Sequence, residues 1–279
     1  MNAKEENSAN TKEESRVVSA SQQDYLRRLS QRRRRILAAR IMLFVLFLLL
    51  WEMAVQLGWI DGFIFSSPSR VLRTFKSMWS DGSIFLHTGI TLTETLLSFA
   101  LVVVIGVAVA VLLWCSSTLS EILEPYLVVL NSLPKSALAP LLIVWIGANM
   151  KSIIVAGISV AIFGTILNLY TAFEGIDADK IKLIYTLQGS KKDVLFRVIL
   201  PGTLPLLISI MKVNIGLCLV GVVIGEFIGA RQGLGYLIIY GSQVFKLDWV
   251  ILSIVILCGI AILLYGFLSL LEKRFSRLS

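Results

Sequence analysis

Several polar side chains lie within long apolar stretches of the chain, where they could contact a solute or an ion. Polar residues recur every three or four positions and so share one face of a helix, namely His87, Thr91, Glu94 or Thr95, and Ser98. Such a face can make hydrogen bonds to neighbouring helices, or it can contact a polar solute. Acids at membrane depth, here Glu94 and Glu226, are also the groups that ion-coupled carriers use. Both alternatives stay open.

Two lysines also lie inside apolar stretches. Lys135 follows Pro134, and it is the first cation to test if the solute is an anion; the alternative is pairing with a carboxylate. Lys212 lies close to Asn214, and it could reach the membrane surface, form a salt bridge or line an anion path. We therefore expect Lys135, Glu94, Lys212 and Asn214 to be the candidates for a translocation path.

Three glycines, Gly221, Gly225 and Gly229, are spaced four residues apart. On a helix this spacing places them on one face, where the missing side chains allow a second helix to approach closely. We interpret them as helix-packing residues.

The composition and the apolar runs of the chain indicate that these residues lie on membrane-spanning helices. Hydrophobic residues make up 56% of the 279 residues and charged residues 16%, against roughly 45–50% and about 25% in soluble domains. Apolar runs of about 20 residues, the length that crosses a bilayer, recur along the chain. We predict an all-α membrane protein with six spans, at about 36–58, 88–114, 122–147, 151–173, 205–229 and 249–271.

Two segments depart from simple spans. The third span contains Pro125, Pro134 and Pro140, so we expect its helix to be kinked or broken and to face the bundle interior. The polar segment 174–204 is compatible with a helix before it reaches Pro201. This loop, between spans 4 and 5, is expected to form a docking helix beneath the membrane.

The N-terminal region is polar and basic. Residues 1–24 contain hardly any large apolar side chains, so we expect them to be mobile, and we place a disordered basic tail at 1–40 before a permease domain at 41–275. The predicted inner segments hold 18 Lys and Arg residues and the outer segments hold six. This bias predicts that both termini are cytoplasmic.

Several classes of function are not expected. The sequence has no Gly-x-x-x-x-Gly-Lys phosphate loop, so the chain does not hydrolyse nucleotide alone, and transport would draw on an ion gradient or a separate ATPase. Ten of the 26 Lys and Arg residues lie in the first 40 residues, which indicates membrane orientation rather than nucleic-acid binding. Isolated cysteines and a single histidine predict no metal site and no disulfide framework.

From about residue 66 to 275 the sequence resembles a family, and separate motifs carry the resemblance. They are Ser67-Pro68-Ser69, Leu133-Pro134-Lys135, Ala139-Pro140-Leu141, Trp145-Ile146-Gly147, Gly225-Glu226-Phe227 and Gly233-Leu234-Gly235-Tyr236. Similar motifs in the same order occur in permease subunits of bacterial binding-protein-dependent ABC importers, in the nitrate/sulfonate/taurine/bicarbonate branch. The resemblance implies a six-span type I importer permease with a cytoplasmic coupling helix between spans 4 and 5.

The family's cytoplasmic signature is Glu-Ala-Ala, three residues, Gly, nine residues, then Ile-x-Leu-Pro. The segment ending at Pro201 keeps this spacing, but Lys182, Leu183 and Ile184 replace Glu-Ala-Ala, and Gln188 replaces Gly. The resemblance implies that the loop helix fits a groove on an ATPase, with Pro201 stopping the helix at a defined place. The alternative is a helix that only lies on lipid headgroups. The implied coupling residues are Lys182, Leu183, Ile184, Tyr185, Thr186, Leu187, Gln188, Gly189, Ser190 and Pro201.

The resemblance also implies partners. They are two copies of an ABC ATPase that bind ATP and Mg²⁺, an extracytoplasmic solute-binding protein, and a second permease copy in a homodimer or a related heterodimer. The chain itself would hold no cofactor and would lie in the bacterial plasma membrane. The implied substrate is an aliphatic sulfonate, taurine, nitrate or a similar anion, with a thiamine-pyrimidine precursor or riboflavin as the alternative. An ion-coupled secondary carrier is the competing class.

Overall fold

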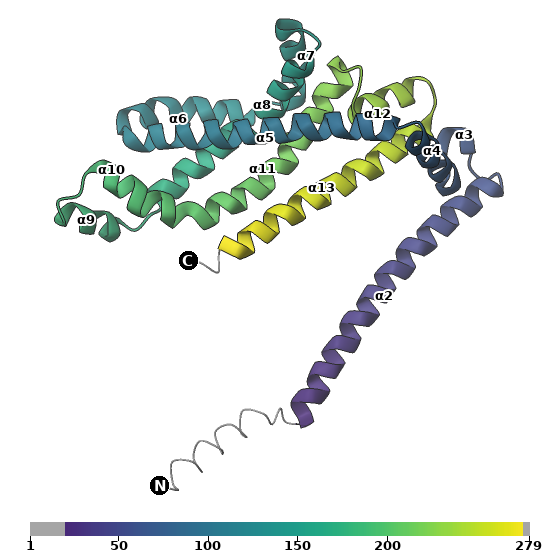
Figure 1. The fold of residues 1–279 in the computed structure, drawn as a ribbon, viewed down its shortest axis with the longest axis horizontal. Coiled ribbons are helices and arrows are strands. Elements are labelled where there is room, and N and C mark those ends of the chain that lie inside the picture. Colours follow the sequence, from purple (N-terminus) through teal and green to yellow (C-terminus); the bar gives the residue numbers. More distant parts are fainter. Residues whose placement is uncertain (1–19, 276–279) are drawn as a thin grey trace. The chain divides into compact units, whose positions relative to one another are not determined.

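The computed structural model describes residues 20–275, and every regular element in this range is a helix. The chain divides into two compact units at Gly62, each described by itself (Figure 1). The first unit contains α2 (Ala20–Gln56). The other helices are α3 (Gly62–Phe65), α4 (Pro68–Ser80), α5 (Ser83–Cys115), α6 (Ser117–Ser132), α7 (Lys135–Ile146), α8 (Met150–Glu174), α9 (Ala178–Thr186), α10 (Lys191–Val194), the π-helix η1 (Leu195–Ile199), α11 (Leu200–Gly229), α12 (Leu234–Gln243) and α13 (Leu247–Phe275).

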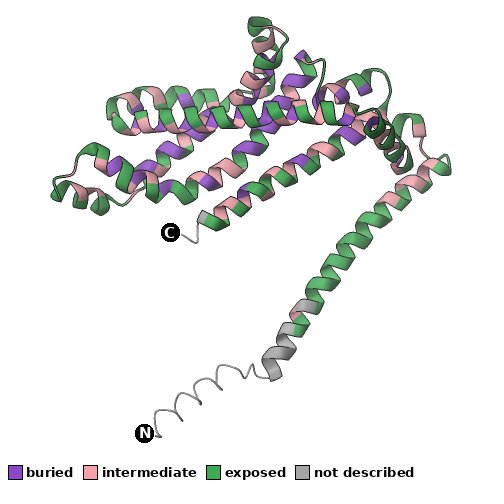
Figure 2. Cartoon of the chain, viewed as in Figure 1, coloured by how far each residue is buried: buried purple, intermediate pink, exposed green. Residues whose placement is uncertain are grey.

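Helix α2 begins earlier than the sequence analysis predicts. The tail placed at residues 1–40 is helical from Ala20 onward, because the Arg- and Leu-rich segment consists of good helix formers that extend the apolar helix. Residues 1–19 lie outside the described residues. None of the most apolar window of α2 is buried within its unit (Figure 2), as lipid-facing residues require.

The predicted spans correspond to helices of the structure. Five helices in the described range are long and apolar enough to cross a membrane, and they number six if the bent pair α6 and α7 is one span. Helices α5, α8 and α13 contain the predicted spans 88–114, 151–173 and 249–271, and α2 contains the first predicted span up to Gln56. The remaining long helix runs from Lys191 to Gly229 and contains the predicted span 205–229.

The third predicted span is broken, as expected, but more sharply than a kink. Helices α6 and α7 meet at 97°. The break lies at Leu133, which is extended because it precedes Pro134, whereas Pro125 and Pro140 lie inside helices. Leu133 at the break is 37% exposed in the single chain, and the expectation that the break faces the bundle interior stays a prediction.

The core of the second unit forms where α8 packs against α5 and α11 (Figure 2). The three predicted packing glycines lie at this contact or beside it. A Cβ atom at Gly221 would lie 2.8 Å from the Cα of Gly157, one at Gly225 3.2 Å from Ile153, and one at Gly229 2.8 Å from Ile143 of α7. Small residues therefore bring α11 against α8 and α7.

A Gly221→Val variant is expected to destabilise the second unit by about 1–3 kcal/mol, because its side chain would overlap the backbone of α8. Thermal unfolding of the purified protein measures this loss. Gly216 is the matched control on the same helix: a Cβ added there would have no atom within 4 Å, so Gly216→Ala should be neutral or stabilise by up to about 1 kcal/mol. Equal effects of the two substitutions would contradict the packing role.

Candidate functional site

The segment between α8 and α11 forms the predicted loop helix, α9, followed by α10 and η1. Ile181 and Ile184 of α9 pack against the core cluster that contains Phe173 and Val194. On the outer face, by contrast, Leu183 is 58% exposed and Leu187 70% exposed. Leu187 is the C-cap of α9, four residues after Leu183, so the helix and its cap present an exposed apolar surface at the end of the unit.

The end of α9 explains why the family motif has glycine at one position. Gln188 has a φ of +59°, in the left-handed region that favours glycine. Its N–H donates to Tyr185 O (3.0 Å), and the N–H of Gly189 donates to Ile184 O (2.9 Å). This is a Schellman C-terminus, in which glycine commonly occupies the left-handed position. Gln188 fills that position here.

The prediction that Pro201 ends the loop helix is wrong. Helix α9 already ends at Thr186, and Ser190 caps α10 in a capping box with Asp193. Pro201 lies in the first turn of α11, where the missing N–H is tolerated, and Pro205 lies further inside the same helix. Helix α9 is therefore ended by the turn at Gln188 and Gly189.

A buried polar cluster lies at the other end of the second unit, around Glu226 of α11. The Glu226 carboxylate, which is fully buried, accepts a hydrogen bond from the Thr91 hydroxyl (2.6 Å) and another from the Gly235 N–H. The Thr91 hydroxyl also accepts the Leu234 N–H (2.8 Å). This cluster joins α5, α11 and the start of α12, and it satisfies the buried acid.

His87 connects the same loop to α5. Its Nδ1 accepts the N–H of Gly233 (3.0 Å), and its ring stacks on Tyr236 with centroids 6.2 Å apart. Gly233 has a φ of +115°, and a Cβ there would overlap the Glu226 carboxylate. Only glycine fits this position.

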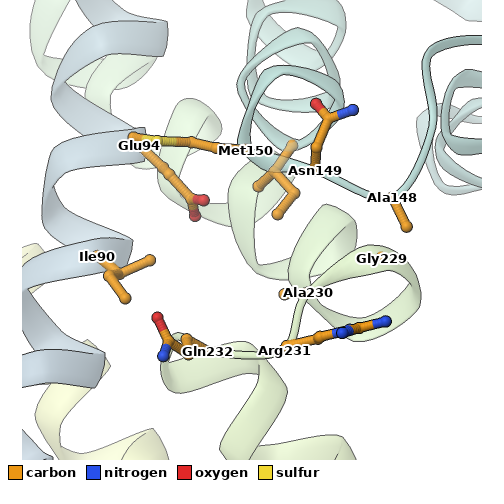
Figure 3. A pocket seen from close by; sticks show the side chains of 10 residues that line it. Ile90, Glu94, Ala148, Asn149, Met150, Gly229, Ala230, Arg231 and Gln232 are labelled. Atoms are coloured by element: carbon orange, nitrogen blue, oxygen red, sulfur yellow. The ribbon is translucent and has the colours of Figure 1, made fainter.

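The predicted polar stripe on α5 is buried as one face. Thr91, Glu94, Thr95 and Ser98 are all at most 2% exposed, and the Ser98 hydroxyl lies 3.1 Å from Ile154 O of α8. Most of this stripe is therefore used for contacts between or within helices. Glu94 differs from the rest, because it lines a cavity of about 280 Å³ together with residues of α8 and the loop after α11 (Figure 3).

The two in-span lysines have partners. Lys135 Nζ donates to the backbone carbonyl of Asn131, so it lies across the α6–α7 bend rather than against a carboxylate. Lys212 Nζ lies 2.6 Å from Glu272 Oε2 of α13, which is the salt bridge that the sequence left as one of three alternatives. Asn214 donates to the Thr165 hydroxyl of α8 (2.7 Å).

Sequence reasoning missed the loop after α11 as a functional element. Arg231 and Gln232 line the cavity with Glu94, and the backbone N–H groups of the next residues surround Glu226. Backbone donors leave no trace in side-chain spacing. The pair Gly233 and Gly235 was the available signal, because glycines beside an in-span acid indicate close approach of the backbone.

The structure combines helices long and apolar enough to cross a membrane with an exposed helix, α9, at one end and a cavity of about 280 Å³ at the other. The family of binding-protein-dependent transport system inner membrane components matches residues 102–277. The chain is 31% identical over 232 residues to a probable ABC transporter permease protein of Haemophilus influenzae, covering 82% of this chain and 92% of the relative. It is 27% identical over 225 residues to the putative aliphatic sulfonates transport permease protein SsuC of Bacillus subtilis, covering 81% and 82%.

A solved structure of the MetNI methionine ABC transporter in an inward-facing conformation has a similar fold, with a TM-score of 0.59 and 20% identity over 67% of this chain and 94% of that chain. Other relatives are named as permeases for formylaminopyrimidine, riboflavin, taurine and bicarbonate. The chain therefore belongs to the binding-protein-dependent transport system inner membrane component family. It is a membrane-embedded permease subunit of an ABC importer.

Proposed function

We propose that this permease imports a small solute by alternating access, driven by two copies of a separate ATPase that dock on α9. The main observation is the outward apolar face of α9 at Leu183 and Leu187, beside an inward face anchored in the core by Ile181 and Ile184. Such a helix offers a partner an apolar surface and passes its movement to α8 and α11. The alternative is a helix that only lies on lipid headgroups.

The docking surface differs in charge from the family pattern. Lys182 stands where the signature has glutamate, and its side chain is 75% exposed and only weakly held by Asp179 at 3.2 Å. An ATPase adapted to this chain would therefore present an acidic group to α9.

The position of α9 also determines the proposed membrane orientation. With α9 on the cytoplasmic side, both termini are cytoplasmic, and the cavity at Glu94 faces an extracytoplasmic solute-binding protein. A second copy of the chain completes the channel.

ATP-driven uptake tests this function. The permease and its co-expressed ATPase, reconstituted in liposomes with the binding protein, should take up solute only when ATP is supplied on the ATPase side. A Leu187→Asp variant should lose copurification of the ATPase, whereas Leu187→Met should retain it. Accumulation by the permease alone under an ion gradient would instead identify a secondary carrier.

The solute is proposed to be an aliphatic sulfonate, taurine, nitrate or a similar small anion, as in the branch that the sequence resembles. The names of related permeases for formylaminopyrimidine and riboflavin support the alternative, a thiamine-pyrimidine precursor or riboflavin. Glu94, Lys135, Lys212 and Asn214 stay candidates for the path. Of these, Lys212 and Asn214 are held by neighbouring helices, so Glu94 and Lys135 are the stronger pair.

A Lys135→Met variant is expected to reduce ATP-driven uptake of an anion at least tenfold, because it removes a positive charge at the bend between α6 and α7. Lys135→Arg should retain most uptake. Thermal unfolding of both variants separates this effect from loss of the contact with Asn131. Normal uptake by Lys135→Met would remove the residue from the path.

A further inference from the structure

Glu94 carries an unsatisfied oxygen that faces the cavity. Among the residues that the structure describes, Glu94 Oε2 is a buried side-chain atom without a hydrogen-bond partner, in a residue that is only 2% exposed. In Figure 3 its carboxylate points into the space enclosed with Ile90, Met150 and Gln232. Buried polar atoms in native proteins are almost always paired, so this oxygen is available to a donor that enters the cavity, either a water or a solute.

The neighbouring acid has more partners than Glu94. Glu226 shares a side-chain hydrogen bond with Glu94, and donors from Thr91, Gly235 and Tyr236 also surround the Glu226 carboxylate. Asn149, which also lines the cavity, uses its side chain to cap α8, accepting the N–H groups of Lys151 and Ser152. Asn149 is therefore engaged elsewhere, and Glu94 Oε2 has no partner among the described residues.

The cavity also presents the opposite charge. Arg231 lines it from the loop after α11, is exposed, and forms no ion pair within the described part of the chain. In Figure 3 the Arg231 side chain lies across the lining from Glu94 and extends away from it. The remaining surface is mostly apolar, with Ile90 and Ile153 among the lining residues. A volume of about 280 Å³ suits a solute smaller than the drug-sized ligands that fill about 300–1,000 Å³.

We propose that this cavity binds a small zwitterion whose amine donates to Glu94 Oε2 and whose acid group faces Arg231. The inference rests on the proposed function and narrows its substrate class from anions to amino acids and aminosulfonates. A simple cation would meet Arg231 without a counter-charge of its own, and a simple anion would bring no donor to Glu94 Oε2. The zwitterion satisfies both groups.

Charged thiol reagents test the cavity without ATPase or ATP. In the purified full chain, with Cys115, Cys218 and Cys258 replaced, Gln232→Cys supplies a reporter thiol in the cavity lining. Its reaction rates with 2-aminoethyl and 2-sulfonatoethyl methanethiosulfonate are compared. Glu94→Gln should slow the amine reagent at least fivefold and change the sulfonate reagent less than twofold. Arg231→Gln should show the reverse pattern.

Two controls restrict the result to this cavity. A Ser80→Cys reporter at the end of α4, which does not line the cavity, should give the same rates in all backgrounds. Glu94→Asp keeps the carboxylate and should retain the preference for the amine reagent, which separates loss of the acid from misfolding. A change in the amine rate below fivefold, or an equal change at Ser80→Cys, overturns the proposal.

Protection identifies the class of ligand. At least one of glycine, β-alanine and taurine should slow labelling of Gln232→Cys, while ethylamine and ethanesulfonate at the same concentration should not. Protection by none of the three, or equal protection by the single-charge compounds, also overturns the proposal. Charge-selective labelling without ATP-driven uptake would refute the proposed function alone, and uptake without charge selectivity would refute the zwitterion site alone.

Discussion

A Glu226→Ala variant is expected to lose about 3–5 kcal/mol of folding stability, which is the largest stability effect that the structure predicts. Its carboxylate is fully buried and receives the Thr91 hydroxyl and the Gly235 N–H. Removing it leaves the Gly235 N–H unpaired at about 1–3 kcal/mol and opens a cavity between α11 and α12, whereas the Thr91 hydroxyl keeps the His87 carbonyl at 3.2 Å as an acceptor. Removing the Glu226 carboxyl group also removes its close contact with the Glu94 carboxyl group. This gain offsets only part of the loss, because it involves a single neighbouring residue.

Thermal unfolding in detergent and the yield of folded protein from membranes measure this effect. Glu226→Gln keeps the shape but turns an amide donor towards the donors of the loop, so an intermediate loss is expected. Glu121→Ala is the control, because this glutamate of α6 is exposed and its replacement should change stability by less than about 0.5 kcal/mol. A stability of Glu226→Ala equal to that of Glu121→Ala would show that the cluster around Glu226 does not hold α12 in place.

The spans could be predicted because lipid imposes a simple rule on sequence. An apolar run of about 20 residues has to be helical to satisfy its backbone, so α5, α8 and α13 follow from composition alone. Their ends were less predictable: α2 extends to Ala20 because its arginines are good helix formers even where hydropathy falls. The break at Pro134 was visible in sequence, whereas the 97° angle depends on how α7 packs against α8 and α11.

Of the candidate site, the residues on α5 could be predicted from the sequence, but their partners could not. The spacing of Thr91, Glu94 and Ser98 placed them on one face of α5, and that face is buried. Their partners could not be read, because they are backbone N–H groups of the loop that enters α12 and a carboxylate 135 residues further along the chain. Side-chain patterns identify which residues turn inward, but tertiary packing decides which of them pair and which, like Glu94, are left facing a cavity.

The glycine signature shows how a replaced motif residue can keep its structural role. The motif spacing puts Gln188 at the glycine position, which suggests a departure from the family pattern. The structure gives Gln188 a φ of +59° and both hydrogen bonds of a Schellman turn. The turn is thus retained at the cost of strain that glycine would not carry. Gly189, the next residue, is the position where a side chain cannot be added.

Gly189→Val is expected to reduce stimulation of the partner ATPase at least tenfold while the permease stays folded. A Cβ at this position would lie 2.5 Å from Ile184 Cγ2 and 2.9 Å from Ile184 O, the carbonyl that accepts the Gly189 N–H. Because backbone is involved, the turn has to open and α9 has to change its direction relative to η1 and α11. ATPase rates of the reconstituted complex, with and without loaded binding protein, measure the coupling.

The Gln188→Gly variant tests whether coupling depends on the direction of α9 or on the backbone strain at Gln188. Glycine adopts a positive φ freely, so this variant should keep or raise coupling and stabilise the turn by up to about 1 kcal/mol. The folding stability of Gly189→Val should fall by no more than about 1 kcal/mol, since α9 has no buried residue of its own. If Gly189→Val stimulated the ATPase like the unmodified chain, the direction of α9 would not transmit the movement of the ATPase. Helices α10 and η1, which pack in the core through Val194 and Ile199, would then have to transmit it.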